Sequence, residues 1–190
     1  MTLLAPADLV ALAKKEPGTL TFGTAGVGTA LHIAALELEN LTGIKLTLVH
    51  YRGAAPALTD VIAGHINAVI MGPSVALTTV KAGKLKMLAF ASAKRLPQFQ
   101  DVPTMAETIP GYEASVSFGL FAPAGVSVEI SKKINADVHK IVGDPDFQKK
   151  YLDRFAVQPV PGPLDAFAAY LQEDSKRWGE VIKKANVKIE

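Results

Sequence analysis

The sequence predicts an α/β protein in which helices cover a mostly parallel sheet, followed by a helical C-terminal part. Over the first half of the chain, short apolar runs with strand character alternate with amphipathic helical segments. Glycine or proline closes most of these segments. This alternation is typical of βαβ units, whose parallel strands are buried by helices on both faces.

Strand and helix signals follow one another from the start of the chain. Strands are expected at 19–23, 45–51, 68–71 and 85–91, and helices at 8–15, 29–41, 56–63 and 74–81. In the second helix, Leu31, Ala34 and Leu38 recur at helical spacing, and Gly43 follows as a C-terminal stop. Ser74 is expected to cap the last of these helices.

The alternation ends after residue 91, where prolines at 97, 103 and 110 indicate a surface excursion. The remaining expected elements are a strand at 117–122, helices at 128–142, 145–155 and 163–185, and a short strand at 157–160. We therefore predict an α/β ligand-binding lobe at 1–117, and a crossover strand with C-terminal helices at 118–190.

The composition is that of a globular protein, with 49% hydrophobic and 20% charged residues. No apolar run approaches the length that spans a bilayer. The formal charge is only +2, and the lysines are scattered in pairs instead of forming one basic face. We therefore expect no nucleic-acid partner. Cysteine is absent, which excludes disulfides, thiol catalysis and thiolate metal sites.

No signal peptide is recognisable, because Pro6 and Asp8 follow Met1 without a basic start and an apolar run. The expectation is that the protein either remains in the cytoplasm or begins after a removed or deleted segment.

The stretch from Gly23 to Thr29 lies between a predicted strand and a predicted helix, and is rich in glycine. Backbone N–H groups at a helix start are unpaired and carry the positive end of the helix dipole. Gly26 and Gly28 would let a ligand approach the backbone, and Ala25 lies between the strand and these glycines. The hydroxyls of Thr24 and Thr29 would be further hydrogen-bond donors. This arrangement suits a carboxylate or phosphate oxygen. The alternative is a tight turn with an ordinary N-cap at Thr29.

Nucleotide motifs do not fit this stretch. A dinucleotide fingerprint would need glycine or alanine where Leu31 stands, and an acidic residue where the next strand ends in His50 and Tyr51. A P-loop would need lysine and a hydroxyl residue where Thr29 and Ala30 stand. We therefore expect no cofactor.

Metal and catalytic motifs are also missing. The histidines are dispersed and no carboxylate cluster accompanies them, so no metal site is expected. His32, one turn into the second helix, either faces a ligand or packs beneath the loop. Gly72-Pro73-Ser74 resembles a nucleophile elbow but lacks its second glycine. We therefore predict no enzymatic activity, with an α/β-hydrolase-like enzyme as the less favoured alternative.

Further polar groups follow the other predicted strands. Tyr51 and Arg52 come after the second strand, and Gly72 and Ser74 come after the third. In an open parallel sheet the ligand crevice lies beyond the carboxyl ends of the strands. We therefore expect these residues near the glycine-rich stretch. Arg52 is either a partner for a carboxylate or a solvated side chain, and Tyr51 is either a ligand contact or an aromatic residue at the core edge.

Several strings, in this order, resemble one family over nearly the whole chain. They are Phe22-Gly23-Thr24-Ala25-Gly26, Tyr51-Arg52-Gly53-Ala54-Ala55-Pro56, Asp101-Val102-Pro103-Thr104 and Gly119-Leu120-Phe121-Ala122-Pro123-Ala124-Gly125. The sequence is similar to the Bug or TctC-type solute receptors of tripartite tricarboxylate transporters.

The resemblance implies a periplasmic-binding-protein-like fold of type II and a periplasmic receptor whose lobes close on a small carboxylate. The ligand would be a di- or tricarboxylate or an acidic amino acid, passed to the membrane permease subunits of the transporter. The family pattern matches at the following positions: Gly23, Thr24, Gly26, Gly28, Thr29, His32, the turn at 51–53 and the aromatic Phe118.

Two kinds of departure accompany the resemblance. Asn67 and Gly72 stand where the family usually has acidic residues, which would remove negative charge from the ligand rim. The family also has a long segment ahead of the point that matches Met1, so the chain would hold the second lobe and only part of the first. A truncated paralogue that acts through protein contacts alone is therefore an alternative.

The apolar faces of the last helices would then lack the sheet that they cover. The residues concerned are Ile134, Val138, Ile141, Phe167, Tyr170, Leu171 and Trp178. Large exposed apolar patches favour association. We therefore expect the chain to form a homo-oligomer through the C-terminal helices or to repack this part.

Overall fold

The computed structural model describes residues 5–185. The chain divides into two compact units, one made of residues 1–116 with 180–190 and the other of residues 117–179. Each unit is described by itself.

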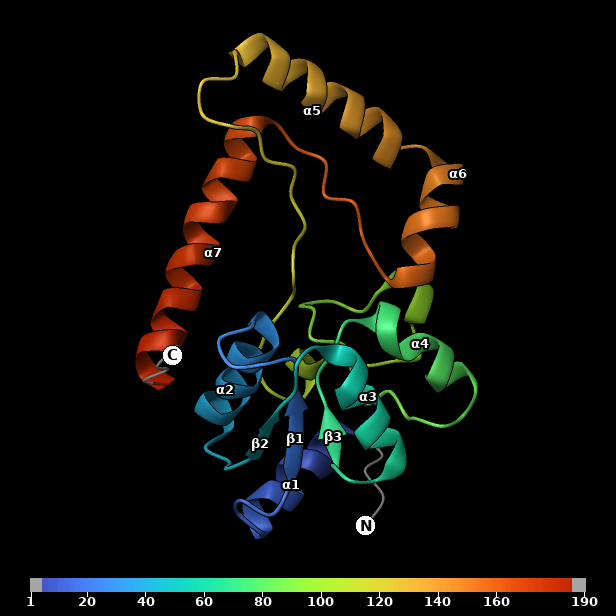
Figure 1. Cartoon of the computed structure of the whole chain (residues 1–190), viewed down its shortest axis with the longest axis vertical. Helices are drawn as coiled ribbons and strands as arrows, with labels where there is room; N and C mark the ends of the chain where they lie inside the picture. Colours follow the sequence, from blue (N-terminus) through green and yellow to red (C-terminus); the bar gives the residue numbers. More distant parts are fainter. Residues whose placement is uncertain (1–4, 186–190) are drawn as a thin grey trace. The chain divides into compact units, whose positions relative to one another are not determined.

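The first unit is built on a parallel sheet of β1 (Thr21–Thr24), β2 (Thr47–His50) and β3 (Ala68–Val69), in the order β2-β1-β3. β1 is central: Thr21 pairs with Thr47 on one side, and Phe22 with Ala68 on the other. Figure 1 shows helices of the first unit beside this sheet. The predicted fold class, a parallel sheet flanked by helices, is confirmed.

Helices alternate with the strands, and the second and third helices connect β1 to β2 and β2 to β3. The helices are α1 (Pro6–Lys15), α2 (Ala30–Thr42), α3 (Ala54–Ala63) and α4 (Pro73–Lys81). α2 and α3 end at Gly43 and Gly64, which both adopt the left-handed conformation that glycine permits. The core between helices and sheet is apolar, and its larger members are Leu9, Leu20, Phe22, Ile33, Leu38, Ile44, Ile66 and Leu77.

The strand expected at 85–91 is wrong. In this segment, Phe90 forms one isolated parallel bridge with Thr104. Its N–H donates to the carbonyl of Pro103 at 2.9 Å, and its carbonyl accepts from Met105 at 2.8 Å. Because Pro103 has no N–H of its own, the pairing cannot extend toward the start of the segment. Two short 3₁₀ turns, Pro97–Phe99 and Met105–Glu107, complete the excursion.

A buried tyrosine that follows the excursion packs against α2 within the first unit. The Tyr112 ring is 2% exposed, and its hydroxyl donates to the carbonyl of Ala34 in α2 at 3.1 Å. Burial raises the pKa of Tyr112 well above its usual range. On the excursion's surface, Arg95 pairs with Glu107 through two hydrogen bonds of 2.8 and 2.6 Å.

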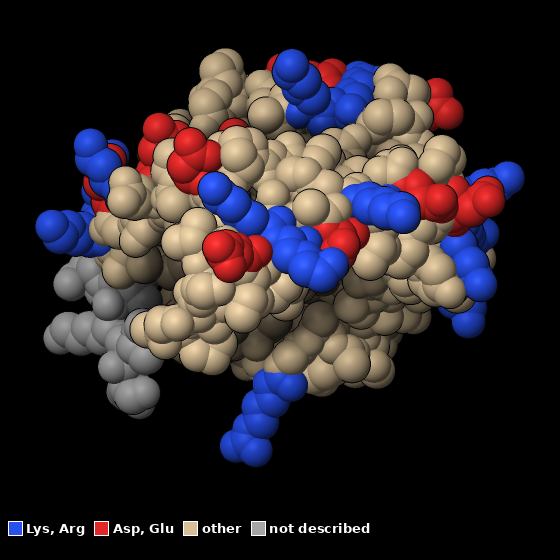
Figure 2. Space-filling view, turned by 90° about the horizontal axis from the view of Figure 1, so that it is seen from above, with Lys and Arg blue, Asp and Glu red and all other residues tan. Residues whose placement is uncertain are grey.

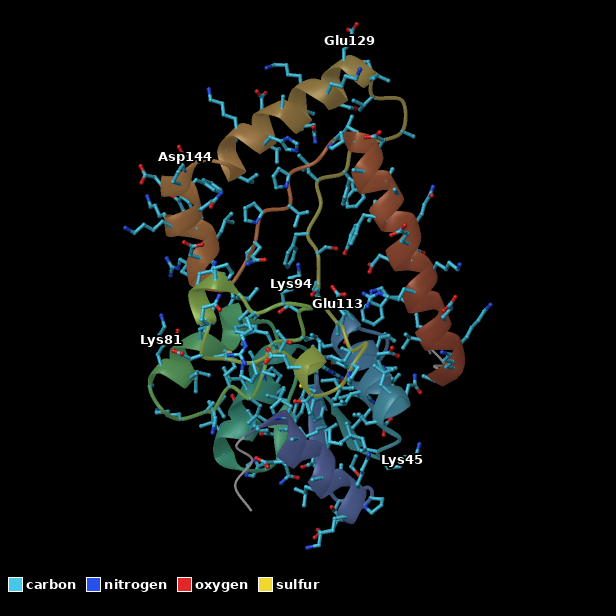
Figure 3. All side chains as sticks on the ribbon, turned by 180° about the vertical axis from the view of Figure 1, so that it is seen from behind. Lys45, Lys81, Lys94, Glu113, Glu129 and Asp144 are labelled. Carbon is cyan, nitrogen blue, oxygen red and sulfur yellow. The ribbon has the colours of Figure 1, made fainter. Side chains whose placement is uncertain are left out.

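The second unit consists of helices and extended chain. Its elements are α5 (Val128–Val142), α6 (Pro145–Phe147), the π turn η3 (Gln148–Leu152), the 3₁₀ turn η4 (Asp153–Phe155) and α7 (Leu164–Ala185), whose last residues belong to the first unit. Acidic residues lie at two helix starts, where they complement the dipole. Glu129 is in the first turn of α5, and Asp144 caps α6 (Figure 3).

The strands expected at 117–122 and 157–160 are not found in the described part of the second unit. Both segments are extended, but a strand requires a hydrogen-bonded neighbour, and neither segment has one. Both segments therefore have the apolar pattern of a strand but no neighbouring strand with which to form a sheet.

No described residue of the second unit is buried. Phe118 is 87% exposed and Val160 is 91% exposed. Of the apolar residues expected on open faces, Ile134, Ile141 and Tyr170 are exposed, and the others are half-buried. Local contacts account for part of this burial, such as the Phe121 and Phe167 rings with centroids 5.7 Å apart.

Among the described residues, no helix is both long and apolar enough to cross a membrane. On the face drawn in Figure 2, basic and acidic side chains lie interspersed instead of gathering by sign.

Candidate functional site

The carboxyl ends of the three strands bring two of the predicted segments into direct contact. The Tyr51 N–H donates to the carbonyl of Thr24 at 3.1 Å, and the Gly53 N–H donates to that of Ala25 at 3.2 Å. These bonds continue the β1–β2 ladder beyond the strands, so the turn at 51–53 lies beside residues 23–29, here called the glycine loop. On the other side of β1, Ile70 donates to the carbonyl of Gly23 at 3.3 Å.

Positive backbone angles shape the glycine loop. Gly26 has φ 131° and Gly28 has φ 75°, both in the region that disfavours residues with a Cβ. A Cβ on Gly26 would also lie 3.3 Å from the carbonyl oxygen of Tyr51. The loop therefore needs glycine at this point both for its conformation and for its close approach to the neighbouring turn.

Thr29 is the N-cap of α2, as the simpler of the two interpretations predicted. Its Oγ1 accepts from the His32 N–H at 3.3 Å and donates to the carbonyl of Gly26 at 2.8 Å. The expectation that this hydroxyl is a free donor for a ligand is therefore wrong, because its proton is already used inside the loop.

Thr24 is also used internally. Its side chain is fully buried, and its Oγ1 lies 2.7 Å from Nδ1 of His50, at the end of β2. The hydroxyls of Thr24 and Thr29 thus hold the loop and the strand ends together rather than facing outward.

Several backbone amides of the loop remain unpaired. Among the described residues, no group accepts a hydrogen bond from the N–H groups of Ala25, Gly26 and Val27, or from those of Ala30 and Leu31 in the first turn of α2. The first turn of α2 carries no acidic residue that would offset the dipole. The loop therefore presents uncompensated positive backbone dipoles, which suit an anionic oxygen.

His32 packs beneath the loop. It is 6% exposed, and its Nδ1 accepts a hydrogen bond from the Gly28 N–H at 3.0 Å. The ring of His50 meets it edge-on, with centroids 4.6 Å apart. Burial lowers the pKa of His32, and the charge of His50 lowers it further.

The hydroxyl of Tyr51 is bound to a carboxylate of α3. The hydroxyl donates to Oδ2 of Asp60 in α3 at 2.8 Å, and the other oxygen of Asp60 lies 3.3 Å from Nδ1 of His65. The pKa of Asp60 is lowered mainly by the hydrogen bond from Tyr51, and then by the hydrogen bond with His65. The pKa of Tyr51 is raised mainly by burial, and then by the hydrogen bond to Asp60. Asp60 and His65 were not predicted from the sequence, because nothing in their spacing marks them as partners of Tyr51.

Arg52 follows at the rim of the same turn. Its side chain is exposed and forms no ion pair within the part of the chain that the structure describes. A guanidinium in this position is available to an incoming carboxylate.

Gly72 and Ser74 follow β3 at the same edge of the sheet but contact neither the glycine loop nor the turn at 51–53 through any hydrogen bond in residues 5–185. Gly72 is itself the N-cap of α4, with Pro73 in the first helical position. The expected capping by Ser74 is therefore wrong: Ser74 lies inside the helix and is exposed.

Asn67 requires a further correction. Its Oδ1 accepts from the N–H and the hydroxyl of Thr21, at 2.9 and 2.7 Å, at the start of β1. The glycine loop follows the opposite end of β1, so an acidic residue at position 67 would not lie on the ligand rim.

Other concave or ligating features lie elsewhere or are missing. A surface cavity of about 230 Å³ adjoins the C-terminal end of α2, between Gly43 and Lys184, and so lies at the far end of that helix from the glycine loop. Within the described residues, no cluster of three or more histidines and carboxylates could hold a metal ion.

Comparison with known proteins links this geometry to a family. Residues 4–187 match the family model described as the tripartite tricarboxylate transporter family receptor. The chain is 30% identical over 190 residues to the UPF0065 protein in the tcbD-tcbE intergenic region of Pseudomonas sp. strain P51, covering 95% of this chain and 56% of that protein. The chain thus spans about half the length of this curated relative.

Solved structures share the fold. R. palustris Rpa4515 with adipate superimposes with a TM-score of 0.85 at 29% identity, covering 98% of this chain and 62% of that chain. MatC from Rhodopseudomonas palustris with bound malate gives a TM-score of 0.74 at 27% identity, covering 94% of this chain and 62% of that chain.

Proposed function

Because the chain belongs to the tripartite tricarboxylate transporter receptor family, we propose that it binds a small carboxylate at the glycine loop. The family and the fold are those of solute-binding receptors and not of enzymes, as the sequence predicted.

The observation that carries the proposal is the set of unpaired amides at Ala25, Gly26 and Val27, with those of Ala30 and Leu31 behind them. One carboxylate group accepts several such hydrogen bonds at once, and the α2 dipole favours its charge. Arg52, exposed on the adjoining turn, would bind the same group or a second carboxylate of the ligand.

The other predicted site residues have supporting roles in this proposal. Gly28, Thr24, Thr29 and His32 hold the loop in place through their own hydrogen bonds. Tyr51 contributes its backbone and ring, since its hydroxyl is bound to Asp60. Gly72 and Ser74 remain candidates for the outer part of the ligand, because they follow β3 at the same edge of the sheet.

Dicarboxylates are the substrate class that we propose. Two structural relatives contain adipate and malate, which each have two carboxylate groups on a short chain. We further propose that the receptor acts in the periplasm and delivers its ligand to the permease subunits of a tripartite transporter.

Calorimetry with adipate, malate, citrate and glutamate tests the proposal, with adipamide as the uncharged control. Gly26→Ala should weaken binding of the preferred acid at least about tenfold, because Cβ strains the loop at positive φ. Gly18→Ala is the matched control: Gly18 also has positive φ, with nothing within 4 Å of the added Cβ. Equal affinity for adipate and adipamide, or an unchanged Gly26→Ala variant, contradicts the proposal.

A second role is favoured by the second unit. None of its described residues is buried, and Phe118 and Val160 are almost fully exposed. Exposed apolar surface of this kind promotes association, so we propose that copies of the chain self-associate through this unit.

A further inference from the structure

The contact between Gly28 and His32 determines which nitrogen of the imidazole carries the proton. Gly28 donates its N–H to Nδ1 at 3.0 Å, so Nδ1 must offer a lone pair. The ring is therefore neutral and protonated only on Nε2. A proton added to Nδ1 would point at the N–H of Gly28, and the two donors would repel each other.

We propose that His32 is a positioning residue that holds the glycine loop in its anion-binding conformation only while its ring is neutral. Protonation releases the Gly28 amide, loosens the loop and weakens carboxylate binding. This inference rests on the proposed function, since it assigns a pH response to the same loop.

The loop is built so that loss of this bond matters. Its other internal hydrogen bonds both end on the carbonyl of Gly26, from the Thr29 hydroxyl at 2.8 Å and the Thr29 N–H at 3.3 Å. Gly28 itself has no partner besides His32 in the described structure. Glycine at positive φ reorients easily once that partner is withdrawn.

Within residues 5–185, no group beside His32 stabilises a charged ring. From β2, the titratable group that faces it is His50, which would add like charge. From β1, Thr24 is neutral and is bound to His50. The glycine loop contributes no charged side chain, and the first turn of α2 carries no acidic residue. Only burial and His50 act on its pKa, and both lower it.

The direction of the effect follows from this shift. Because the pKa of His32 is lowered from 6.5 in the folded chain, the unfolded chain takes up the proton first as the pH falls. The stabilising contact is therefore complete above about pH 6.5 and is lost as the pH falls through the lowered value.

The first experiment needs no ligand. Imidazole and amide NMR spectra of the full chain are recorded from about pH 8 down to well below the ordinary histidine pKa, because the pKa of His32 is lowered. We expect the Nε2–H tautomer at neutral pH, and a Gly28 amide shift whose midpoint coincides with that of His32. In His32→Asn, whose Oδ1 can replace Nδ1 as acceptor, the Gly28 amide should not respond to pH. His65→Asn, at an exposed histidine, should leave the wild-type response unchanged.

The second experiment measures binding of adipate at about pH 7.5 and at a pH below the His32 midpoint that the NMR titration gives, because that midpoint lies below the ordinary histidine pKa. Loss of one hydrogen bond corresponds to about fivefold weaker binding at the lower pH in the wild type. His32→Asn should bind adipate as tightly as the wild type at neutral pH, and should not show the loss of about fivefold at the lower pH. Because adipate itself titrates equally in both measurements, the difference between variant and wild type reports on His32 alone. His32→Leu should bind weakly at both values.

The two experiments distinguish a failure of this inference from a failure of the proposed function. A Gly28 amide that does not follow the His32 titration, or a ring with its proton on Nδ1, overturns the inference whatever adipate does. If neither adipate nor any other acid of the panel binds at any pH, the proposed function fails, and the NMR titration alone decides whether His32 governs the loop.

Discussion

The fully buried hydroxyl of Thr24 lies 2.7 Å from Nδ1 of His50, an exposed residue at the end of the neighbouring strand. This bond joins the ends of β1 and β2 at the point where the glycine loop and the turn at 51–53 begin. It also places His50 against His32, so that one threonine connects the loop to both imidazoles.

Replacing Thr24 by valine removes this bond at nearly constant volume. We expect the free energy of unfolding to fall by about 1 kcal/mol, the usual net contribution of one hydrogen bond. Urea denaturation at pH 7.5 measures it. Thr24→Ser retains the hydroxyl and serves as the control, so a serine variant destabilised as much as the valine variant would assign the loss to packing.

His50→Asn should raise the pKa of His32, because the charge of His50 is one of the two causes that lower it. The pKa should remain below 6.5, since burial, the larger cause, is unchanged. An NMR titration of His32 in the variant checks this. A lower pKa in His50→Asn would show that His50 stabilises the charged form of His32 instead.

Tyr51→Phe removes the largest cause of the lowered Asp60 pKa. That carboxylate contributes stability above its ordinary pKa of 3.8, and the contribution is lost as the pH falls through the lowered value. The variant should therefore be less stable than the wild type at pH 7, with a difference that shrinks in acid. Denaturation curves at pH 7 and at a pH below 3.8 test this. A difference in stability that is independent of pH would argue for a packing effect of the hydroxyl.

Arg52→Ala should weaken binding of a dicarboxylate by about tenfold or more, the effect of losing a charge-assisted hydrogen bond. Arg52→Lys should recover only part of the affinity, because an ammonium group cannot form the paired contacts of a guanidinium. Calorimetry at low and moderate salt provides the measurement. An alanine variant that binds as tightly as the wild type would leave Arg52 as a solvated side chain.

Self-association of the second unit can be followed by light scattering at increasing protein concentration. We expect the apparent mass to rise above 20.1 kDa, and to rise less for the double variant Phe118→Ser and Val160→Ser. Ile62→Ser is the matched control, since Ile62 is 42% exposed on α3 in the first unit. A monodisperse monomer at all concentrations would contradict the proposal.

The parts of the fold that depend on neighbouring residues were predictable. The helices from α1 to α5 and α7 begin and end within a few residues of their expected positions, because glycine, proline and helical spacing act locally. Strands were predicted less well. Residues 85–91, 117–122 and 157–160 have strand character, yet in the described structure none of them joins the sheet.

The same division applies to the candidate site. Sequence alone located the glycine loop and its helix start, and gave an N-cap at Thr29 as one of two interpretations; these are features of adjacent residues. It did not reveal that Thr24 bonds His50, that Tyr51 bonds Asp60, or that Asn67 lies at the other end of β1.

By itself the sequence determined the helices, the three strands of the sheet, the position of the loop and the family. Only the tertiary structure decided which hydroxyls and amides are used internally and which remain for a ligand. The physical reason is that a hydrogen bond depends on distance and direction between groups that the chain brings together from far apart, whereas capping and periodicity depend on residues a few positions away.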